Sequence, residues 1–300
     1  MSYNNKYYCF GGDLMNNKID LHVHSYMSDG TCSPKEIIEL ACKNGIKAIA
    51  LTDHDNIDGI SEAEREAIKH NVAFLKGIEI SSLYENGRIL HIIGLGIDTG
   101  NSEFLKVYTR MKKAREESVK YILKILETQG IYIDIDVLKK NSLNQYLDRY
   151  DIHKYFIQSG ISNNAQDIWD KYLDPIAYGS DELIKVEETI EIIRKSGGLS
   201  FLAHYNKRIG LQGFSKIQME EHIKKLMCLG LDGIEKYYPS YTKEDIEYLN
   251  YLVNKYNLIP SGGTDFHGKN RPEIGLGVGS NNFSIPFSIY ENIIGKLNII

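Results

Sequence analysis

Several features are scarce in this chain of 300 residues, and each scarcity argues against a class of protein. The four cysteines (Cys9, Cys32, Cys42 and Cys228) are scattered without a C-x-x-C pair, which indicates reduced thiols in a cytosol rather than a disulfide framework. No run approaches the roughly 18 consecutive apolar residues of a membrane span, and no basic region followed by an apolar core begins the chain. A net charge of -5 and a pI near 6.0 argue against a broad basic surface. We therefore expect a cytoplasmic protein with no membrane partner and no stable duplex nucleic-acid partner.

The composition is otherwise that of an ordinary globular chain. Hydrophobic residues make up 42% and charged residues 25%, so a sizeable core is available. Residues 1–17 are polar, rich in Tyr and Asn, and without periodic pattern. We predict that they form a disordered leader, with Met15 as a candidate true start.

The clearest local signal is the sequence Asp20-Leu21-His22-Val23-His24, followed by Ser28-Asp29-Gly30. Residues i and i+2 of a strand point to the same face, so His22 and His24 project side by side and can bind a metal together. Further polar residues follow other strand-like runs, namely Asp53, His54, Asp55, Glu79, His91, His204, Asp265 and His267. His, Asp and Glu are the ligands that borderline and hard divalent metals prefer.

Strand-like runs alternate with helical patterns along most of the chain. The helix expected from Ser33, for example, has an N-cap serine, a first-turn proline and a glutamate three residues after the cap. Such alternation predicts an α/β fold with a parallel sheet, helices outside and a site at the carboxyl ends of the strands. Strands are expected near residues 20, 49, 77, 92, 201, 233 and 260. About seven strands favour a barrel, although the count leaves an open sheet possible.

The pattern changes to long helical stretches between residues 101 and 179, which contain the only tryptophan, Trp169. We predict a helical insertion domain over 101–179 that caps the site and selects the substrate. Residues 18–100 and 180–300 would form the barrel. The charged run at 112–117 is interpreted as a solvated helix face.

Nine potential ligands are more than one ion needs, because a catalytic zinc has about three protein ligands and one water. Each has a structural alternative when taken alone: Asp29 can form a turn, Glu79 can be a buried strand acid, and His91 can be a satisfied core histidine. Together these alternatives would bury many unpaired polar groups at a high cost. Two to three divalent ions are therefore expected, and clustered metals of this kind hold a bridging hydroxide and stabilise a phosphoryl or acyl centre.

Six motifs of this chain resemble, in order, those of the polymerase-and-histidinol-phosphatase (PHP) superfamily. They are His22-Val-His24, Ser28-Asp29-Gly30, Thr52-Asp53-His54-Asp55, Gly77-Ile-Glu79, Ala203-His204 and Thr264-Asp265-Phe266-His267-Gly268. The resemblance runs from about residue 18 to the end. It is nearest to the stand-alone phosphoesterases that act on nucleoside 3',5'-bisphosphates and trim RNA from the 5' end. It implies a distorted seven-stranded (β/α) barrel with a trinuclear site of manganese, zinc or iron.

The resemblance also implies roles for individual residues. One metal would be bound by His22, His24 and Asp265, a second by His91 and His204 with Glu79 as the bridge, and a third by Asp29, His54 and His267. Asp265 would also act catalytically by accepting a proton from the attacking water. Asp53 and Asp55 would orient His54.

The chain departs from the family pattern within the insertion. It has Asp148-Arg149-Tyr150-Asp151 where the branch usually shows Gly-Arg-Pro-His, and Tyr205 follows His204 where proline is usual. Arg149 remains a candidate phosphate-binding residue, and the alternative is an ion pair with a neighbouring aspartate on a helix surface. Lys207 and Arg208 are further candidates for substrate binding. These departures leave the metal ligands intact and the substrate open.

The sequence thus predicts a metal-dependent phosphoesterase that hydrolyses a small or nucleotide phosphate monoester, such as a nucleoside 3',5'-bisphosphate. Its partner would be a small phosphorylated substrate, such as a nucleotide or a short RNA 5' end. A histidinol-phosphate-type phosphatase is the alternative within this class, and a metal-dependent amidohydrolase is the alternative outside it. A non-catalytic module with a structural metal is disfavoured because such sites are normally closed and cysteine-rich.

Overall fold

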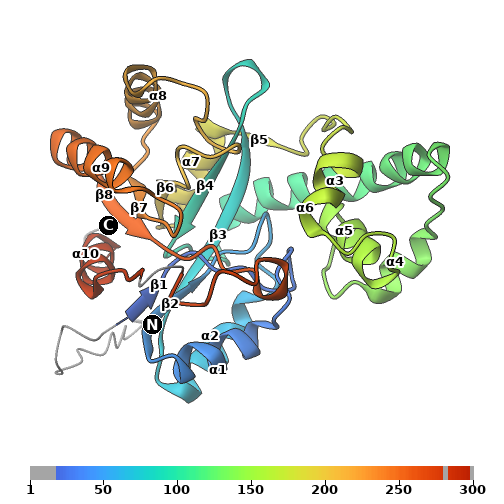
Figure 1. Cartoon of the computed structure of the whole chain (residues 1–300), viewed down its shortest axis with the longest axis horizontal. Coiled ribbons are helices and arrows are strands. Elements are labelled where there is room, and N and C mark those ends of the chain that lie inside the picture. Colours follow the sequence, from blue (N-terminus) through green and yellow to red (C-terminus); the bar gives the residue numbers. More distant parts are fainter. Residues whose placement is uncertain (1–17, 280–282, 298–300) are drawn as a thin grey trace.

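The computed structural model describes residues 18–279 and 283–297, so the predicted leader at 1–17 lies outside the described residues (Figure 1). Within them, a single sheet runs in the order β1-β2-β3-β4-β6-β7-β8, and the short β5 pairs with β3. The strands are β1 (Lys18–Asp20), β2 (Ile46–Leu51), β3 (Ala73–Leu83), β4 (Ile89–Leu95), β5 (Ile184–Lys185), β6 (Leu199–Leu202), β7 (Gly233–Tyr237) and β8 (Ile259–Gly262). The seven strands of the main path match the seven expected.

The two edges of this sheet meet, which makes it a distorted barrel. Leu21 donates its backbone N–H to the carbonyl of Gly262 at 3.1 Å, and His24 donates to Phe266 at 3.0 Å. A parallel bridge between Val23 and Phe266 continues the contact beyond the ends of β1 and β8. The predicted α/β barrel is confirmed.

One strand runs against the expected parallel direction. β4 pairs antiparallel with both β3 and β6, whereas the other pairs along the main path are parallel. The sheet is therefore parallel, as predicted, except at β4. The reversal arises because a short turn around η2 (Glu85–Gly87) joins β3 directly to β4, and a turn of this length cannot make a parallel crossover. It also brings the start of β4 to the end of the barrel where the other strands finish.

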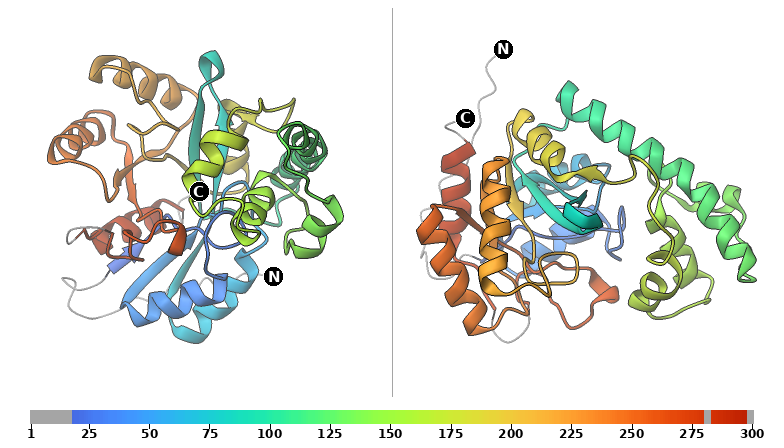
Figure 2. Two further views of the ribbon diagram at one scale, coloured as in Figure 1. Left: turned by 45° about the vertical axis from the view of Figure 1, so that its right-hand side comes forward. Right: turned by 90° about the horizontal axis from the view of Figure 1, so that it is seen from above.

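Helices cover the outside of the barrel (Figures 1 and 2). They are α1 (Pro34–Lys43), α2 (Ile60–His70), α7 (Val186–Lys195), α8 (Lys216–Cys228), α9 (Lys243–Tyr256) and α10 (Phe287–Leu297). The predicted capping box of α1 is present, since the Ser33 hydroxyl accepts from the Glu36 N–H and the Glu36 carboxylate accepts from the Ser33 N–H. α10, which the sequence analysis did not predict, packs its apolar face into the same core as β1 and β6. None of the described helices has the length and apolar character needed to cross a membrane.

The segment from 101 to 179 is helical, as predicted, and forms a lobe beside the barrel (Figure 1). It contains α3 (Ser102–Thr128), α4 (Ile135–Asn141), α5 (Arg149–Gln158), α6 (Ala165–Ile168) and the π-helical turn η3 (Trp169–Leu173). The second half of α3 packs with α5 in a separate apolar core. The first half, with Phe104 and Met111, packs into the barrel core instead. A continuous helix thus crosses from one core to the other, and the proposed domain boundary at residue 101 stays a prediction.

The charged run in α3 is not a fully solvated face, so that interpretation was wrong in part. Lys112 and Arg115 are buried, because each has a carboxylate partner. Lys112 Nζ lies 2.7 Å from Asp148 Oδ2, and Arg115 Nη2 lies 2.7 Å from Asp55 Oδ2. Asp55 belongs to the barrel, so the second pair ties the insertion to a loop that also carries His54.

Candidate metal centre

The predicted metal ligands gather in one buried cluster at the end of the barrel where the parallel strands finish. The nine are His22, His24, Asp29, His54, Glu79, His91, His204, Asp265 and His267, and each has at most 9% of its surface exposed. His91 joins them from near the start of its strand, because β4 runs antiparallel to its neighbours. The reversal of β4 thus explains how a residue at the opposite end of a strand reaches the same site.

Glu79 lies at the centre of this cluster, with its two carboxylate oxygens facing different histidines. Oε2 lies 3.2 Å from His22 Nε2, 3.3 Å from His24 Nε2 and 2.9 Å from His54 Nδ1. Oε1 lies 3.0 Å from His91 Nδ1 and 3.1 Å from His204 Nε2. This division is the geometry that a bridging carboxylate between two ions requires.

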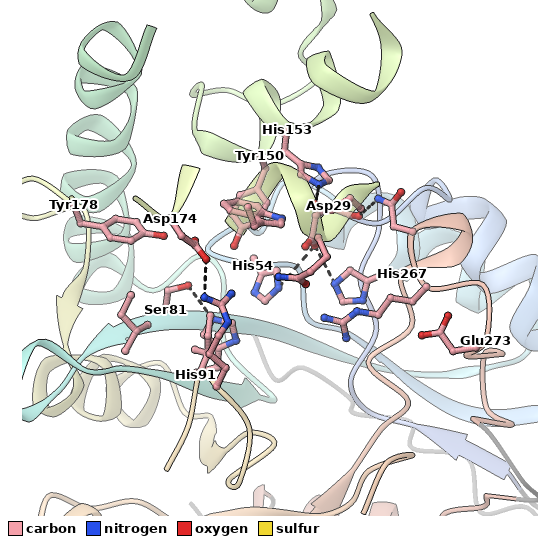
Figure 3. Close-up of a pocket in the computed structure, with 18 residues that line it drawn as sticks. Asp29, His54, Ser81, His91, Tyr150, His153, Asp174, Tyr178, His267 and Glu273 are labelled. Atoms are coloured by element: carbon pink, nitrogen blue, oxygen red, sulfur yellow. Dashed lines mark hydrogen bonds and ion pairs between the residues drawn. The ribbon is translucent and has the colours of Figure 1, made fainter. Parts of the chain in front are cut away.

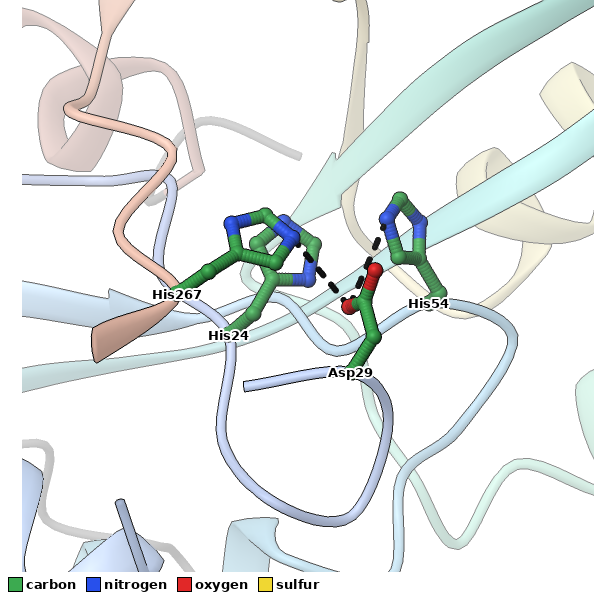
Figure 4. A group of neighbouring side chains, drawn as sticks. All are labelled: His24, Asp29, His54 and His267. Carbon is green, nitrogen blue, oxygen red and sulfur yellow. Dashed lines mark ion pairs between the residues drawn. The ribbon is translucent and has the colours of Figure 1, made fainter. Parts of the chain in front are cut away.

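Asp265 and Asp29 complete two further parts of the cluster. Asp265 Oδ1 lies 3.1 Å from His24 Nε2 and 3.4 Å from His22 Nε2. Asp29 Oδ1 lies 3.1 Å from His267 Nε2 and 3.8 Å from His54 Nε2 (Figure 4). His24 also has a ring nitrogen within reach of this second part.

The backbone around the ligands is tightly packed and locally strained. A Cβ on Gly30 would lie 2.4 Å from the carbonyl oxygen of His24, and one on Gly263 would lie 2.2 Å from the His22 Cβ, so only glycine fits at either position. His204 and Asp265 have positive φ angles of 25° and 55°. Non-glycine residues adopt such angles at a cost and are concentrated at functional sites.

The donor set fits divalent metal ions. Several buried ligand atoms have no hydrogen-bond partner, among them Nε2 of His22, His24 and His267, Glu79 Oε2 and Asp29 Oδ1. Unpartnered buried polar atoms are costly. In three overlapping groups, one possible ligand atom from each residue lies within 4.8 Å of the others: His22, His24, Glu79 and Asp265; His24, Asp29, His54 and His267; and His54, Glu79 and His91. An ion at each group would satisfy them.

Burial and the neighbouring charges shift the pKa values of residues in the cluster. Although burial opposes ionisation, the surrounding histidines hold the pKa of Glu79 well below its usual range. Burial likewise opposes protonation of His24, yet the nearby carboxylates of Asp265 and Glu79 raise its pKa to about 9. Burial lowers the pKa of His91 to about 4. The carboxylates are therefore ionised and ready to bind cations.

A glutamate that the sequence analysis missed holds two of the histidines. Glu235 Oε1 lies 2.8 Å from His22 Nδ1, and Oε2 accepts the backbone N–H of His204 at 2.7 Å. The first contact leaves His22 Nε2 free to face the cluster. Glu235 lies in β7, directly after the run 231–234 that was expected as a strand, so its position matched that of the predicted ligands.

Tyr238 and Arg271, also missed, hold the outer oxygen of Asp265. The Tyr238 hydroxyl donates to Asp265 Oδ2 at 2.9 Å, and Arg271 Nη1 donates to the same oxygen. Burial opposes ionisation of Asp265, but Arg271 and the histidines keep its pKa well below its usual range. The catalytic role expected for Asp265, accepting a proton from water, stays a prediction, and the Arg271 contact works against it.

Asp53 and Asp55 do not orient His54 through hydrogen bonds, contrary to the expectation. Asp53 accepts hydrogen bonds from the Ser25 N–H and hydroxyl and from the Ser28 hydroxyl, which fixes the loop carrying Asp29. Asp55 accepts from the Ser81 N–H on β3. Both carboxylates thus shape the backbone around the cluster.

A cavity of about 300 Å³ opens beside the cluster (Figure 3). Asp29, His54, His91 and His267 line its floor, and Tyr150, His153 and Trp169 from the insertion form a wall. The Tyr150 ring stacks on His54 with a centroid distance of 5.4 Å and an interplanar angle of 7°. Arg208 and Arg271 also line the cavity, as do the carboxylates of Asp174 and Glu273, so it combines aromatic surface with charges of both signs.

The three predicted substrate-binding residues lie in different surroundings. Arg208 lines the cavity, where it pairs with Asp174 at 2.6 Å. Lys207 lies 5.9 Å from the rings of Tyr238 and Tyr241. Arg149 is 2% exposed, and its guanidinium donates to the carbonyls of residues 173, 176 and 177. This network occupies the Nη donors of Arg149, and its Nε lies 3.6 Å from the buried carboxylate of Glu182, so the surroundings match neither a phosphate contact nor the surface ion pair considered above.

The chain is similar to several known proteins. The PHP domain family matches residues 20–179. A 5'-3' exoribonuclease of Haemophilus influenzae is 32% identical over 84% of this chain and 91% of its own length. A 3',5'-nucleoside bisphosphate phosphatase of Chromobacterium violaceum is 29% identical over 83% of this chain and 87% of its own. A structure from Bifidobacterium adolescentis, described as a metal-dependent phosphoesterase, shares the fold with a TM-score of 0.79, at 24% identity over 94% of this chain and 96% of its own.

Proposed function

Because the chain belongs to the PHP domain family, we propose that it is a metal-dependent phosphoesterase acting on a small or nucleotide phosphate ester. The relatives named above support a phosphoric ester as the bond that is hydrolysed. Within this class we favour a nucleoside 3',5'-bisphosphate or the 5' end of a short RNA as the substrate. The observation that carries the proposal is Glu79, whose two oxygens face separate sets of histidines.

We assign two to three divalent ions, of manganese, zinc or iron, to the nine candidate ligands. His22, His24 and Asp265 would bind one, His91 and His204 a second with Glu79 shared, and Asp29, His54 and His267 a third. When bound, such ions polarise the phosphoryl group, neutralise its charge and activate water. Glu79 would be the carboxylate shared by two ions, so no modified lysine of the kind found in many amidohydrolases would be needed.

Other side chains hold the metal ligands in place and are available to bind the substrate. Glu235 fixes the ring of His22, and Tyr238 and Arg271 fix the carboxylate of Asp265, so the ligands are held in place before metals bind. Arg208 and Arg271 face the cavity and can bind substrate oxygens that the ions do not reach.

The aromatic wall closes the cavity on the side of the insertion. Tyr150 and Trp169 lie edge to face with centroids 5.1 Å apart, and His153 stacks on Trp169 at 5.3 Å. The Tyr150 ring covers one face of His54. The rings of this wall also offer a planar surface against which a nucleobase can pack.

The proposal is tested with metal-free protein reconstituted with manganese. The substrates are histidinol phosphate, a nucleoside 3',5'-bisphosphate, a 5'-phosphorylated oligonucleotide and an aryl phosphate. Glu79→Gln should abolish hydrolysis and reduce the number of bound ions, whereas Glu244→Gln, on a side chain that is 76% exposed, should change neither. Elemental analysis that finds one ion or none in active protein would refute the multinuclear assignment.

A further inference from the structure

A second chamber lies beyond the cavity beside the metal ligands. Its volume is about 550 Å³, and Tyr84, Arg88, Phe214 and His222 line its far part. Five residues line both spaces: Ile89, Asp174, Tyr178, Arg208 and Ile209. The two spaces are therefore neighbouring parts of one groove that leads from the metal ligands along the β3–β4 turn.

The walls of this second chamber are firmly held. The Arg88 guanidinium lies over the Phe214 ring, 4.6 Å from its centre, and donates to the Gly210 carbonyl at 2.7 Å. His222 contacts the same ring with a centroid distance of 4.4 Å and shares a 2.9 Å hydrogen bond with the Tyr84 hydroxyl. Aromatic rings combined with arginine are the surface on which proteins stack single-stranded bases without reading their sequence.

An exposed ion pair marks the boundary between the two spaces. Arg208 Nη1 lies 2.6 Å from Asp174 Oδ2, and the two side chains are 57% and 28% exposed. Exposed pairs of this kind contribute little to stability. A phosphate passing this point can therefore replace Asp174 as the partner of Arg208 at little cost.

We propose that the second chamber binds the nucleoside attached to the far side of the phosphate being cleaved, so that the groove accepts a short single-stranded nucleotide chain. The inference rests on the proposed function, because it places the phosphate at the metal ligands. A monoester leaves the chamber empty, whereas a dinucleotide fills it. In that hydrolysis, water adds to phosphorus, the bond from phosphorus to the 3' oxygen breaks, and the departing oxygen takes a proton. The phosphate stays on the second nucleoside.

The chamber is tested by comparing two substrates that differ only in that second nucleoside. They are a nucleoside 3',5'-bisphosphate and the corresponding 5'-phosphorylated dinucleotide. Phe214→Leu keeps an apolar side chain but removes the ring, and we expect it to lower the ratio of kcat/KM, dinucleotide over bisphosphate, about 5- to 50-fold, as for loss of one stacked base. The control Tyr132→Leu removes a ring that is 75% exposed elsewhere and should leave the ratio unchanged.

A binding measurement separates failure of this inference from failure of the proposed function. Titration calorimetry on the protein as purified compares a non-hydrolysable methylenephosphonate dinucleotide with the mononucleotide phosphonate. Tighter binding of the dinucleotide, lost in Phe214→Leu, supports the chamber even if no ester is cleaved. Equal affinities in the parent protein, or a ratio that Phe214→Leu does not change, would overturn it. If the protein hydrolyses no phosphate ester, the proposed function is refuted, but the inference about the second chamber is not.

Discussion

Glu235 offers a sharp test of how the chain holds its metal ligands, because one carboxylate contacts two of them from outside the cluster. Glu235→Gln keeps the size of the side chain but replaces one acceptor oxygen with an NH₂ donor. That donor must face either His22 Nδ1, now at 2.8 Å, or the N–H of His204, now at 2.7 Å. One of the two contacts is lost, and two donors face each other in a fully buried site.

The size of the effect follows from these contacts. Loss of a carboxylate that orients a ligating histidine typically weakens metal binding about 10- to 100-fold, which corresponds to about 1.4–2.8 kcal/mol. The unfolding free energy of metal-free protein should also fall, by about 1–3 kcal/mol, because a buried donor is left unsatisfied. We expect the metal affinity and the stability to fall together.

Chelator competition measures the metal affinity, and urea denaturation of metal-free protein measures the stability. The matched control is Asp232→Asn. Asp232 also holds β6, by accepting hydrogen bonds from the Ser200 N–H at 2.8 Å and hydroxyl at 3.0 Å, but it contacts no metal ligand. Both bonds go to the same oxygen, Oδ2, which the asparagine carbonyl can replace, so the control should keep both its stability and its metal affinity. If Glu235→Gln bound metals as tightly as the parent protein, Glu235 would not be a positioning residue.

Three further predictions follow from the same contacts. Arg149→Lys should lower the unfolding free energy by about 2–3 kcal/mol, because a lysine cannot replace three guanidinium–carbonyl bonds. The kcat/KM values for a bisphosphate and an aryl phosphate should change alike. A loss of kcat/KM for the bisphosphate alone would show that Arg149 binds a phosphate. Arg271→Gln should lower kcat/KM at least about tenfold while elemental analysis shows unchanged metal content, since Asp265 keeps Tyr238. Metal-free protein should lose up to about 3 kcal/mol of stability between pH 6.5 and 9 in urea titrations, because folded His24, with a pKa of about 9, retains a proton that the unfolded chain releases. Metal-loaded protein should not show this loss. If the stability of metal-free protein did not change over this pH range, the raised pKa of His24 would be contradicted.

The candidate ligands could be found from the sequence because their positions follow from simple periodicity. His22 and His24 are two residues apart just after β1, and His204 follows the apolar run that ends β6. Glu79 lies within β3, just beyond the residues that pair with β2. The carboxyl ends of parallel strands meet, so residues far apart in the chain were expected at one place. His91 was included although it starts its strand, and only the antiparallel pairing of β4 shows why it belongs there.

Other parts of the site depend on pairings that no single segment reveals. Glu235 has the position of a predicted ligand, but its contact with His22 becomes known only from the fold. Arg271 resembles an ordinary charged residue until its partner, Asp265, is known. Lys112 and Arg115 belong to a run of charges typical of a solvated helix, and their burial depends on Asp148 and on a barrel loop far away in sequence. The burial and pairing of these residues depend on tertiary contacts, which a local sequence pattern does not show.

The altered motif of the insertion shows how a change of residue type can leave the site usable. Asp151 introduces a negative charge where the related branch has histidine, which would oppose a phosphate if the carboxylate faced the cavity. Instead, Asp151 accepts the Asp148 N–H at 3.0 Å and the Ser142 hydroxyl at 2.8 Å, and it forms the capping box that begins α5. The same helix start places Tyr150 flat against His54. The negative charge is therefore used to set the aromatic wall over the metal ligands, and the positive charge available to the substrate comes from Arg208 and Arg271 on the barrel side.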